Sequence, residues 1–239
     1  MSDIKLDALA IAAHRDDIEI TSGGLMIKLH DLGYKTGGLD FTRGEMGTQG
    51  NEGDREREAE AASKVLGLTV RENLGLPDAQ IEFNRGNVLK TVRVLREYRP
   101  HLVILPYWEQ RHPDHYHCYR IAREACYFAG LEKLDCEGEP FRPHKILYST
   151  YYREPKPSFV VDISDQFERK LEAVKCYMSQ FDPSCESKQI FVPGIDIYDF
   201  IRTRDREYGM QIRKQYAEPY VIKETIEIDD PVKMPVASI

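Results

Sequence analysis

Cysteine is scarce in this sequence, and its spacing excludes two kinds of small scaffold. The chain has 239 residues and five cysteines, an odd number, and no two of them form a C-x-x-C pair. A disulfide framework needs even pairs, and a zinc ribbon needs closely spaced pairs. The pattern instead indicates reduced thiols in a cytoplasmic protein.

Long hydrophobic runs and targeting signals are also missing. The apolar runs at 8–13 and 102–105 are far shorter than the roughly 18 residues of a membrane helix. Residues 1–5 lack the basic start and apolar stretch of a signal peptide. We therefore expect a cytoplasmic protein with no membrane partner.

Basic residues are outnumbered. Forty acidic and 33 basic residues give a net charge of −7, and the sequence pI is about 5.6. Such a chain has no global attraction for nucleic acid or anionic lipid, although a local basic pocket for a small anion stays possible.

Apolar runs alternate with helical periodicity along the chain, and no linker or repeat divides it. Short apolar runs are typical of strands buried in a parallel sheet, and strand–helix alternation favours right-handed crossovers. We expect strands at 7–13, 35–42, 102–107, 145–152 and 158–163, and helices at 25–32, 55–66, 87–98, 115–129, 165–181 and 198–215. Ser164 is the expected N-cap of the helix at 165–181. The prediction is one Rossmann-like α/β domain over 1–239, with a mainly parallel sheet flanked by helices and an irregular tail at 217–239.

Ionisable side chains follow three of the expected strands. They lie at 14–17, 42–45 and 108–115. Ligands of such sheets bind at the carboxyl ends of the strands, so we expect these clusters to converge there. The first contains H-x-x-D and the third contains H-P-D-H. Two histidines and one carboxylate with an open fourth position are the ligand set of a catalytic zinc ion, and the remaining carboxylate and histidine can act on water.

The two motifs together resemble those of a known family. His14-Arg15-Asp16-Asp17-Ile18-Glu19 with Gly23-Gly24, followed by His112-Pro113-Asp114-His115, resembles the LmbE-like (PIG-L-type) zinc-dependent N-acetylglucosaminyl de-N-acetylases. The segments at 42–48, 72–78, 159–164 and 179–181 resemble most the N-acetylglucosaminyl-malate (GlcNAc-malate) deacetylases of bacillithiol biosynthesis. The resemblance implies hydrolysis of the acetamide of GlcNAc-malate to glucosaminyl-malate and acetate.

The resemblance also implies roles for individual residues. His14, Asp17 and His115 are the expected ligands of Zn²⁺, and the same set suits Fe²⁺. Asp16 is the expected general base for the attacking water. His112 is expected to stabilise the oxyanion as a cationic donor, and Asp114 to orient His112 and favour its protonated form.

Malate carries two carboxylates, so its recognition needs cations. Arg43, in the matched motif, is the first candidate for a bidentate contact, and Arg55 and Arg142 match family positions near the site. The alternative is a surface arginine paired with Glu45 or Glu58.

The sequence departs from the family pattern at two positions. Arg15 stands where the family has proline, which loosens the turn that carries two catalytic groups. Gln49 stands where this branch often has an arginine, which weakens the malate assignment. Free GlcNAc, other GlcNAc conjugates, diacetylchitobiose and a thiol conjugate therefore remain alternative substrates.

Two other classes of protein are weighed against a deacetylase. A dinucleotide-dependent dehydrogenase would carry G-x-G-x-x-G after its first strand, which this chain lacks. A non-catalytic sugar- and metal-binding member of the fold would not need Asp16, His112 and Asp114. The resemblance further implies a homo-oligomer, often a hexamer, that acts on a small amino sugar.

Overall fold

The computed structural model describes residues 4–47, 49–151, 155–181 and 196–236. Seven strands of this part of the chain form one sheet, in the order β3-β2-β1-β4-β5-β7-β6. They are β1 (Ala8–Ala12), β2 (Thr36–Thr42), β3 (Val70–Leu76), β4 (Leu102–Pro106), β5 (Lys145–Ser149), β6 (Phe159–Asp162) and β7 (Ala217–Val221). The first five strands are parallel, whereas β7 is antiparallel to β5 and β6. The predicted α/β architecture with a mainly parallel sheet is confirmed.

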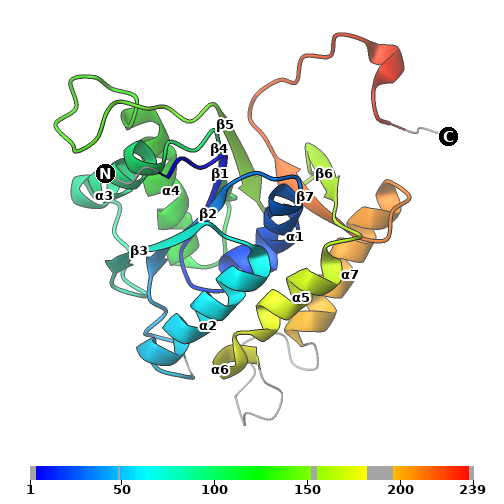
Figure 1. Ribbon diagram of the computed structural model, residues 1–239, viewed down its shortest axis with the longest axis horizontal. Helices are drawn as coiled ribbons and strands as arrows, with labels where there is room; N and C mark the ends of the chain where they lie inside the picture. The colour runs from blue at the N-terminus through cyan, green and yellow to red at the C-terminus, as the bar shows by residue number, and fades with distance from the viewer. Residues whose placement is uncertain (1–3, 48, 152–154, 182–195, 237–239) are drawn as a thin grey trace.

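Helices cover both faces of the sheet. They are α1 (Asp17–Asp31), α2 (Glu52–Leu66), α3 (Arg85–Tyr98), α4 (Pro113–Phe128), α5 (Phe167–Lys175), α6 (Met178–Phe181) and α7 (Ile197–Gln211), followed by a 3₁₀ turn, η1 (Pro231–Lys233). Figure 1 shows α3 and α4 on one face and α1, α2, α5 and α7 on the other. Alternate β1 side chains enter the two cores, Leu9 and Ile11 on the α3–α4 side and Ala10 and Ala12 on the α1 side. No helix in the described ranges is both long and apolar enough to cross a bilayer.

Two strands differ from the prediction. The tail expected to be irregular from residue 217 begins with the buried strand β7, and it is irregular only beyond Val221. β3 was not expected, because its sequence, VRENLGL, contains neither an apolar run nor a clean alternation. β3 is an edge strand whose side chains are mostly half-buried, so sheet pairing rather than burial accounts for it.

Helix α1 begins earlier than the sequence predicts. Gly23 and Gly24 lie inside it rather than before it. A Cβ atom on Gly24 would lie 2.6 Å from Ile163 Cδ1, so glycine allows close packing of the helix there. The Glu218 carboxylate accepts the backbone N–H groups of Gly24 and Leu25, each at 2.8 Å.

The helix expected at 165–181 is divided into α5 and α6. Ser164 is not its N-cap; that position belongs to Gln166. The Ser164 hydroxyl instead donates to Asp162 at 2.7 Å and accepts the backbone N–H groups of Gln215 and Tyr216 at 3.2 Å. It therefore ties the end of β6 to the segment that leads into β7.

A charged cluster is buried between α1, α5, α7 and β7. The Lys170 Nζ atom lies 2.6 Å from Asp205 Oδ2 and 2.7 Å from Glu218 Oε1, and all three side chains are fully buried. Arg204 donates to Asp205 at 2.9 Å and to the Ile20 carbonyl at 2.8 Å. Through Ile20 and Glu218, this cluster holds the middle of α1, the helix that begins at Asp17.

Candidate functional site

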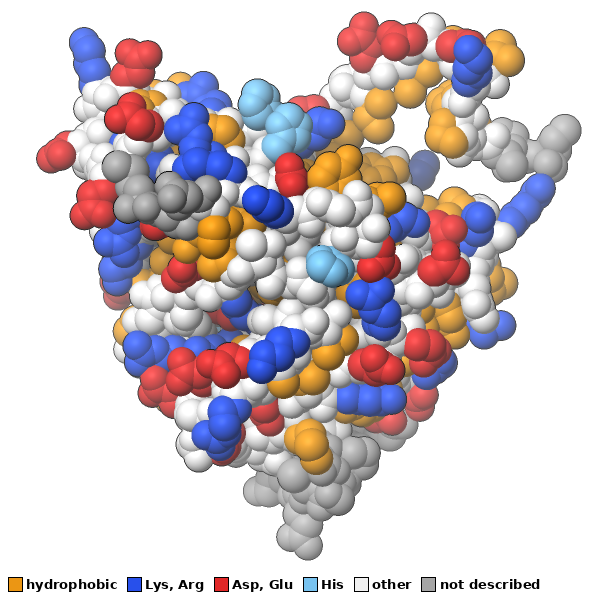
Figure 2. Space-filling model, viewed as in Figure 1, with side chains coloured by type: hydrophobic (Ala, Val, Ile, Leu, Met, Phe, Trp, Pro, Cys, Tyr) orange, Lys and Arg blue, Asp and Glu red, His pale blue; other side chains and the backbone are white. Residues whose placement is uncertain are grey.

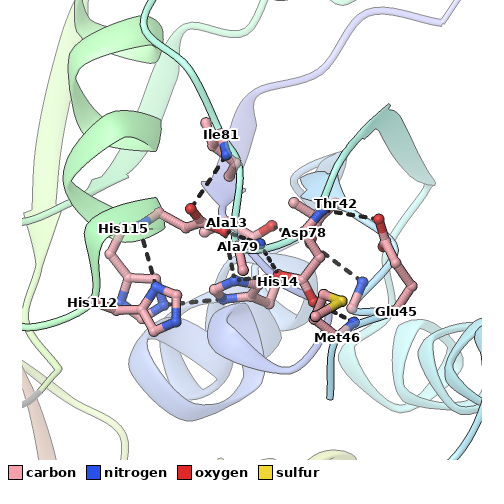
Figure 3. Close-up of polar contacts among 12 residues, drawn as sticks. Ala13, His14, Thr42, Glu45, Met46, Asp78, Ala79, Ile81, His112 and His115 are labelled. Atoms are coloured by element: carbon pink, nitrogen blue, oxygen red, sulfur yellow. Dashed lines mark hydrogen bonds and ion pairs between the residues drawn. The ribbon is translucent and has the colours of Figure 1, made fainter.

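The ionisable clusters that follow β1 and β4 meet at the carboxyl edge of the sheet, as expected. His14 follows β1, and Asp17 is the first residue of α1. Asp114 and His115 lie in the first turn of α4. Figure 3 shows His14 between the two α4-side histidines and Asp78, which follows β3. This edge of the sheet therefore carries the site.

Three potential metal ligands form a compact triangle. His14 Nδ1 lies 3.2 Å from His115 Nε2 and 3.4 Å from Asp17 Oδ2, and the latter two atoms are 3.2 Å apart. Ligands about 2.0–2.1 Å from a tetrahedral ion are separated by about 3.3 Å. The triangle therefore fits one divalent cation, with the two-histidine, one-carboxylate donor set of a catalytic centre.

A second possible group shares His14 with the first. His14, His112 and Asp114 also have ligand atoms within 4.8 Å of one another. The Asp114 carboxylate, however, accepts the backbone N–H groups of Ala79 at 2.8 Å and Ile81 at 3.3 Å. Both Asp114 oxygens therefore have backbone donors, whereas Asp17 accepts only one such donor within the described ranges, the His14 N–H at 2.9 Å. The edges of the Asp17 triangle also match the ligand spacing of a tetrahedral ion, so the first group fits a metal better.

Asp16 occupies a strained position beside the triangle. Its φ of 110° lies in the left-handed region that a non-glycine side chain rarely adopts. Arg55 holds it there, with Nη1 and Nη2 each 3.2 Å from Asp16 Oδ2 and Nη2 also donating to the Arg15 carbonyl. Burial raises the pKa of Asp16 to about 7, against the opposing effect of Arg55. A carboxylate with this pKa suits a general base at neutral pH.

The contact between His112 and Asp114 differs from the expected one. His112 Nδ1 accepts the backbone N–H of Asp114 at 3.2 Å, while the Asp114 carboxylate lies 3.4 Å from His14 Nε2. Burial lowers the pKa of His112, and His14 and His115 lower it further. Asp114 therefore contacts His112 through its backbone N–H, and burial and the two neighbouring histidines disfavour the cationic form of the ring.

Asp78 is a site residue that the sequence reasoning missed. Its Oδ1 lies 3.1 Å from His14 Nε2, and its Oδ2 accepts the Met46 N–H at 2.9 Å. Burial acts to lower the pKa of His14, but hydrogen bonds to Asp114, Asp17 and Asp78 outweigh it and raise that pKa well above its ordinary value. The sequence signal for Asp78 is an acidic residue just after a strand, but the mixed sequence of β3 does not predict that strand.

A pocket of about 290 Å³ opens over these groups. Its floor includes His14, Asp17 and His115, and its walls include Asp16 and Arg55. The volume is near the lower end of the range for small-molecule sites. The arrangement can hold a small polar substrate over a metal ion with a base beside it.

The three predicted substrate arginines lie in different places. Arg55 is buried in the pocket wall and holds Asp16. Arg43 is half-exposed and pairs with Glu52 at 2.6 Å, rather than with Glu45 or Glu58. Arg142 donates to the backbone carbonyl of Tyr127 at 3.2 Å, and its guanidinium lies 4.5 Å from the centre of the Tyr127 ring. Tyr127 is at the opposite end of α4 from His115, about 18 Å along the helix. The structure therefore does not bring Arg142 to the site of its own chain.

The departure at Arg15 is accommodated without disturbing the ligands. Its side chain is buried, donates to the Glu52 carbonyl at 3.4 Å and lies 3.8 Å from Glu56. The added charge is therefore directed toward α2 and away from the ligand triangle.

Comparison with known proteins identifies similar sequences. Residues 9–126 match the sequence model of the family described as PIG-L, GlcNAc-PI de-N-acetylase. The diacetylchitobiose deacetylase of Thermococcus kodakarensis is 32% identical over 229 residues, which cover 91% of this chain and 82% of that protein.

Solved structures show the same fold over nearly the whole chain. The conserved protein TT1542 from Thermus thermophilus is 36% identical with a TM-score of 0.85, covering 93% of this chain and 97% of that one. The N,N'-diacetylchitobiose deacetylase from Pyrococcus horikoshii, in complex with an inhibitor, is 28% identical with a TM-score of 0.77. That match covers 89% of this chain and 82% of the other.

Proposed function

Because the chain belongs to the PIG-L (LmbE-like) family of deacetylases, we propose that it hydrolyses the acetamide of an N-acetylglucosaminyl conjugate at a metal centre. The observation that carries this proposal is the triangle of His14, Asp17 and His115, with edges of 3.2–3.4 Å. The pocket leaves one side of the triangle open to a substrate. A protein that only binds a sugar would not need Asp16, a carboxylate with a strained backbone and a pKa of about 7, beside the metal ligands.

In the proposed mechanism the ligands hold the ion and two further residues move or donate protons. When bound, a divalent cation polarises the acetyl carbonyl and makes water more acidic. Asp16, held by Arg55, accepts the proton of the attacking water. His112 Nδ1 accepts the Asp114 N–H, so the ring proton lies on Nε2, which donates to the oxyanion of the tetrahedral intermediate. The C–N bond then breaks, a proton passes from Asp16 or His112 to the departing amine nitrogen, and acetate and the free amine are released. Asp78 and Asp114 orient His14 from the side opposite its Nδ1 ligand atom.

Zinc is the proposed metal, with ferrous iron as the alternative. Two imidazoles and one carboxylate suit both ions, so the donor set supports a metal without choosing between them.

Removal of the metal is the direct test of this proposal. Purified protein treated with a chelator is expected to release no amine from N-acetylglucosamine conjugates, and added Zn²⁺ or Fe²⁺ is expected to restore release. The measurement is amine formation by fluorescamine, with bound metal quantified by mass spectrometry. Amine release that is independent of metal, or no release from any acetamido sugar by the metal-replete protein, would contradict the proposal.

GlcNAc-malate is the proposed specific substrate, and a chitobiose-type disaccharide is the second candidate. The first is supported by Arg43, a half-exposed cation that approaches Gly75 at the end of β3; to bind a malate carboxylate, Arg43 would exchange its exposed partner Glu52 for the substrate. The second is supported by two relatives named for diacetylchitobiose and by an acidic pocket in which Arg55 is already paired. Both substrates carry the same acetamide, so the two candidates differ only in the protein residues that would bind the malate or the second sugar.

Replacement of Arg43 separates these candidates. For Arg43→Gln we expect KM for GlcNAc-malate to rise about tenfold, because one charge-assisted carboxylate contact is lost, with little change in kcat. KM for diacetylchitobiose is expected to stay unchanged. The control is Arg57→Gln, which removes an exposed arginine from the same region. Equal kcat/KM for GlcNAc-malate in wild-type and Arg43→Gln protein would rule out this role for Arg43.

A further inference from the structure

An arm, residues 222–236, follows β7 and leaves the body of the molecule (Figure 1). Five of its apolar residues fall at even positions: Ile226 and Ile228 before η1, Val232 within it, and Met234 and Val236 after it. In the segments on either side of η1, this spacing is the period of an extended chain with one apolar face. They are exposed: Ile226 by 53%, Ile228 by 42%, Val232 by 93%, Met234 by 40% and Val236 by 66%. Figure 2 shows the arm standing clear of the body, with apolar side chains along it.

A groove of about 570 Å³ lies beside the root of this arm. It runs between α4, β5 and β6 and is called the α4–β5 groove here; its lining includes Arg123, Tyr127, Arg142, Lys145, Ile146 and Phe159. None of the residues assigned to the metal site or the pocket above it lines this groove.

The groove contains an open strand edge. β5 pairs with β4 along its full length, but with β7 only at Tyr148 and Ser149. Among the described strands, none pairs with this side of β5 at Lys145–Leu147. An exposed strand edge accepts an extended segment by backbone hydrogen bonding, while flanking pockets receive alternate side chains.

Charge and polarity match between the arm and the groove. The arm carries four acidic residues, Glu224, Glu227, Asp229 and Asp230, and two lysines. The groove presents Arg123, Arg142 and Lys145 beside apolar side chains, and the one acidic residue among the described residues of its lining is Glu224 from the root of the arm. An acidic strand with one apolar face therefore complements a basic groove with an apolar floor.

We propose that the arm of one chain lies in the α4–β5 groove of a second copy of this chain, pairing along β5. The arm's own root, Ile222 to Ile226, already forms one wall of the groove in its own chain, and the arm then turns away from it. Exchange between copies covers the apolar face, satisfies the open edge of β5 and places Arg142 in an interface. The proposal does not depend on the deacetylase activity.

A cross-linking experiment tests which chain supplies the arm. One full-length chain carries Ile228→Cys and a second, differently tagged chain carries Ile146→Cys; the two are mixed and treated with a short bis-maleimide. A cross-linked pair containing both tags is the expected result. Wild-type chains treated alike report the background from native cysteines, of which Cys118 and Cys126 are buried.

The oligomeric state provides an independent readout. Ile228→Ser with Val232→Ser and Met234→Ser is expected to raise the dissociation constant of the assembly by about tenfold or more, because apolar burial is lost. The matched control, Thr225→Ser with Glu227→Gln, changes polar positions of the arm and is expected to have a smaller effect. Molar mass by light scattering over a dilution series measures both. Absence of a cross-linked pair that contains both tags, or an unchanged molar mass for the serine variant, would overturn the proposal.

Discussion

Asp16→Asn is expected to lower kcat by about 10²–10⁴-fold, because general-base catalysis contributes effects of that size. Asparagine keeps the shape of the side chain, and its amide oxygen can still accept from Arg55, which lies 3.2 Å from the carboxylate. It also tolerates the left-handed backbone at this position, where φ is 110°. Folding should therefore be preserved while the proton acceptor is lost. The measurement is kcat for amine release at saturating substrate.

Two controls separate a catalytic effect from a structural one. Metal content is expected to match that of the wild type, because Asp16 is not one of the three proposed ligands. The thermal midpoint is expected to fall, because the buried Arg55 guanidinium loses its carboxylate partner, so kcat is measured well below that midpoint. Asp31→Asn changes a carboxylate at the other end of the same helix, where it pairs with Arg169 at 2.8 Å, and should leave kcat unchanged. A kcat within about threefold of the wild type for Asp16→Asn would exclude Asp16 as the general base.

The parts of the site that sequence reasoning located are those attached to strongly patterned strands. β1 and β4 are fully or largely buried apolar runs, so their ends, and the histidine motifs that follow, could be found by counting along the chain. Asp78 follows β3, whose alternation is broken by polar residues, and it was missed for that reason. A site residue could therefore be predicted from the sequence only where the strand before it has a clear apolar pattern.

Contacts between distant segments could not be predicted in the same way. Glu218 was placed in an irregular tail, yet it accepts two backbone N–H groups of α1, nearly 200 residues earlier in the chain. Arg55, which the resemblance predicts to contact the substrate, lines the pocket and also holds Asp16, a contact that the sequence does not predict. Both contacts depend on how elements distant in the sequence pack against one another, and the local periodicity of a sequence does not specify that packing. The sequence indicates which side chains could carry chemistry, and tertiary packing decides which of them touch.

Lys170→Met is expected to lower the free energy of unfolding by about 3–5 kcal/mol, because removal of one partner leaves buried charges uncompensated. Lys170 Nζ lies 2.6 Å from Asp205 and 2.7 Å from Glu218, and none of these side chains reaches solvent. Methionine nearly preserves the length and volume of lysine, so lost charge rather than a cavity dominates the effect. Urea unfolding followed by circular dichroism measures the change.

The same helix supplies a matched control for this prediction. Lys175→Met replaces an exposed lysine of α5 and should change the free energy of unfolding by less than about 0.5 kcal/mol. If Lys170→Met does not fold, the double variant Lys170→Met with Asp205→Asn removes one charge of each sign and should recover part of the lost stability. A single variant as stable as the Lys175→Met control would mean that water or rearrangement compensates Asp205 and Glu218. In that case the hydrogen bonds from Gly24 and Leu25 to Glu218 would not depend on Lys170. The position of α1, and with it that of Asp17 at its start, would then also be independent of Lys170.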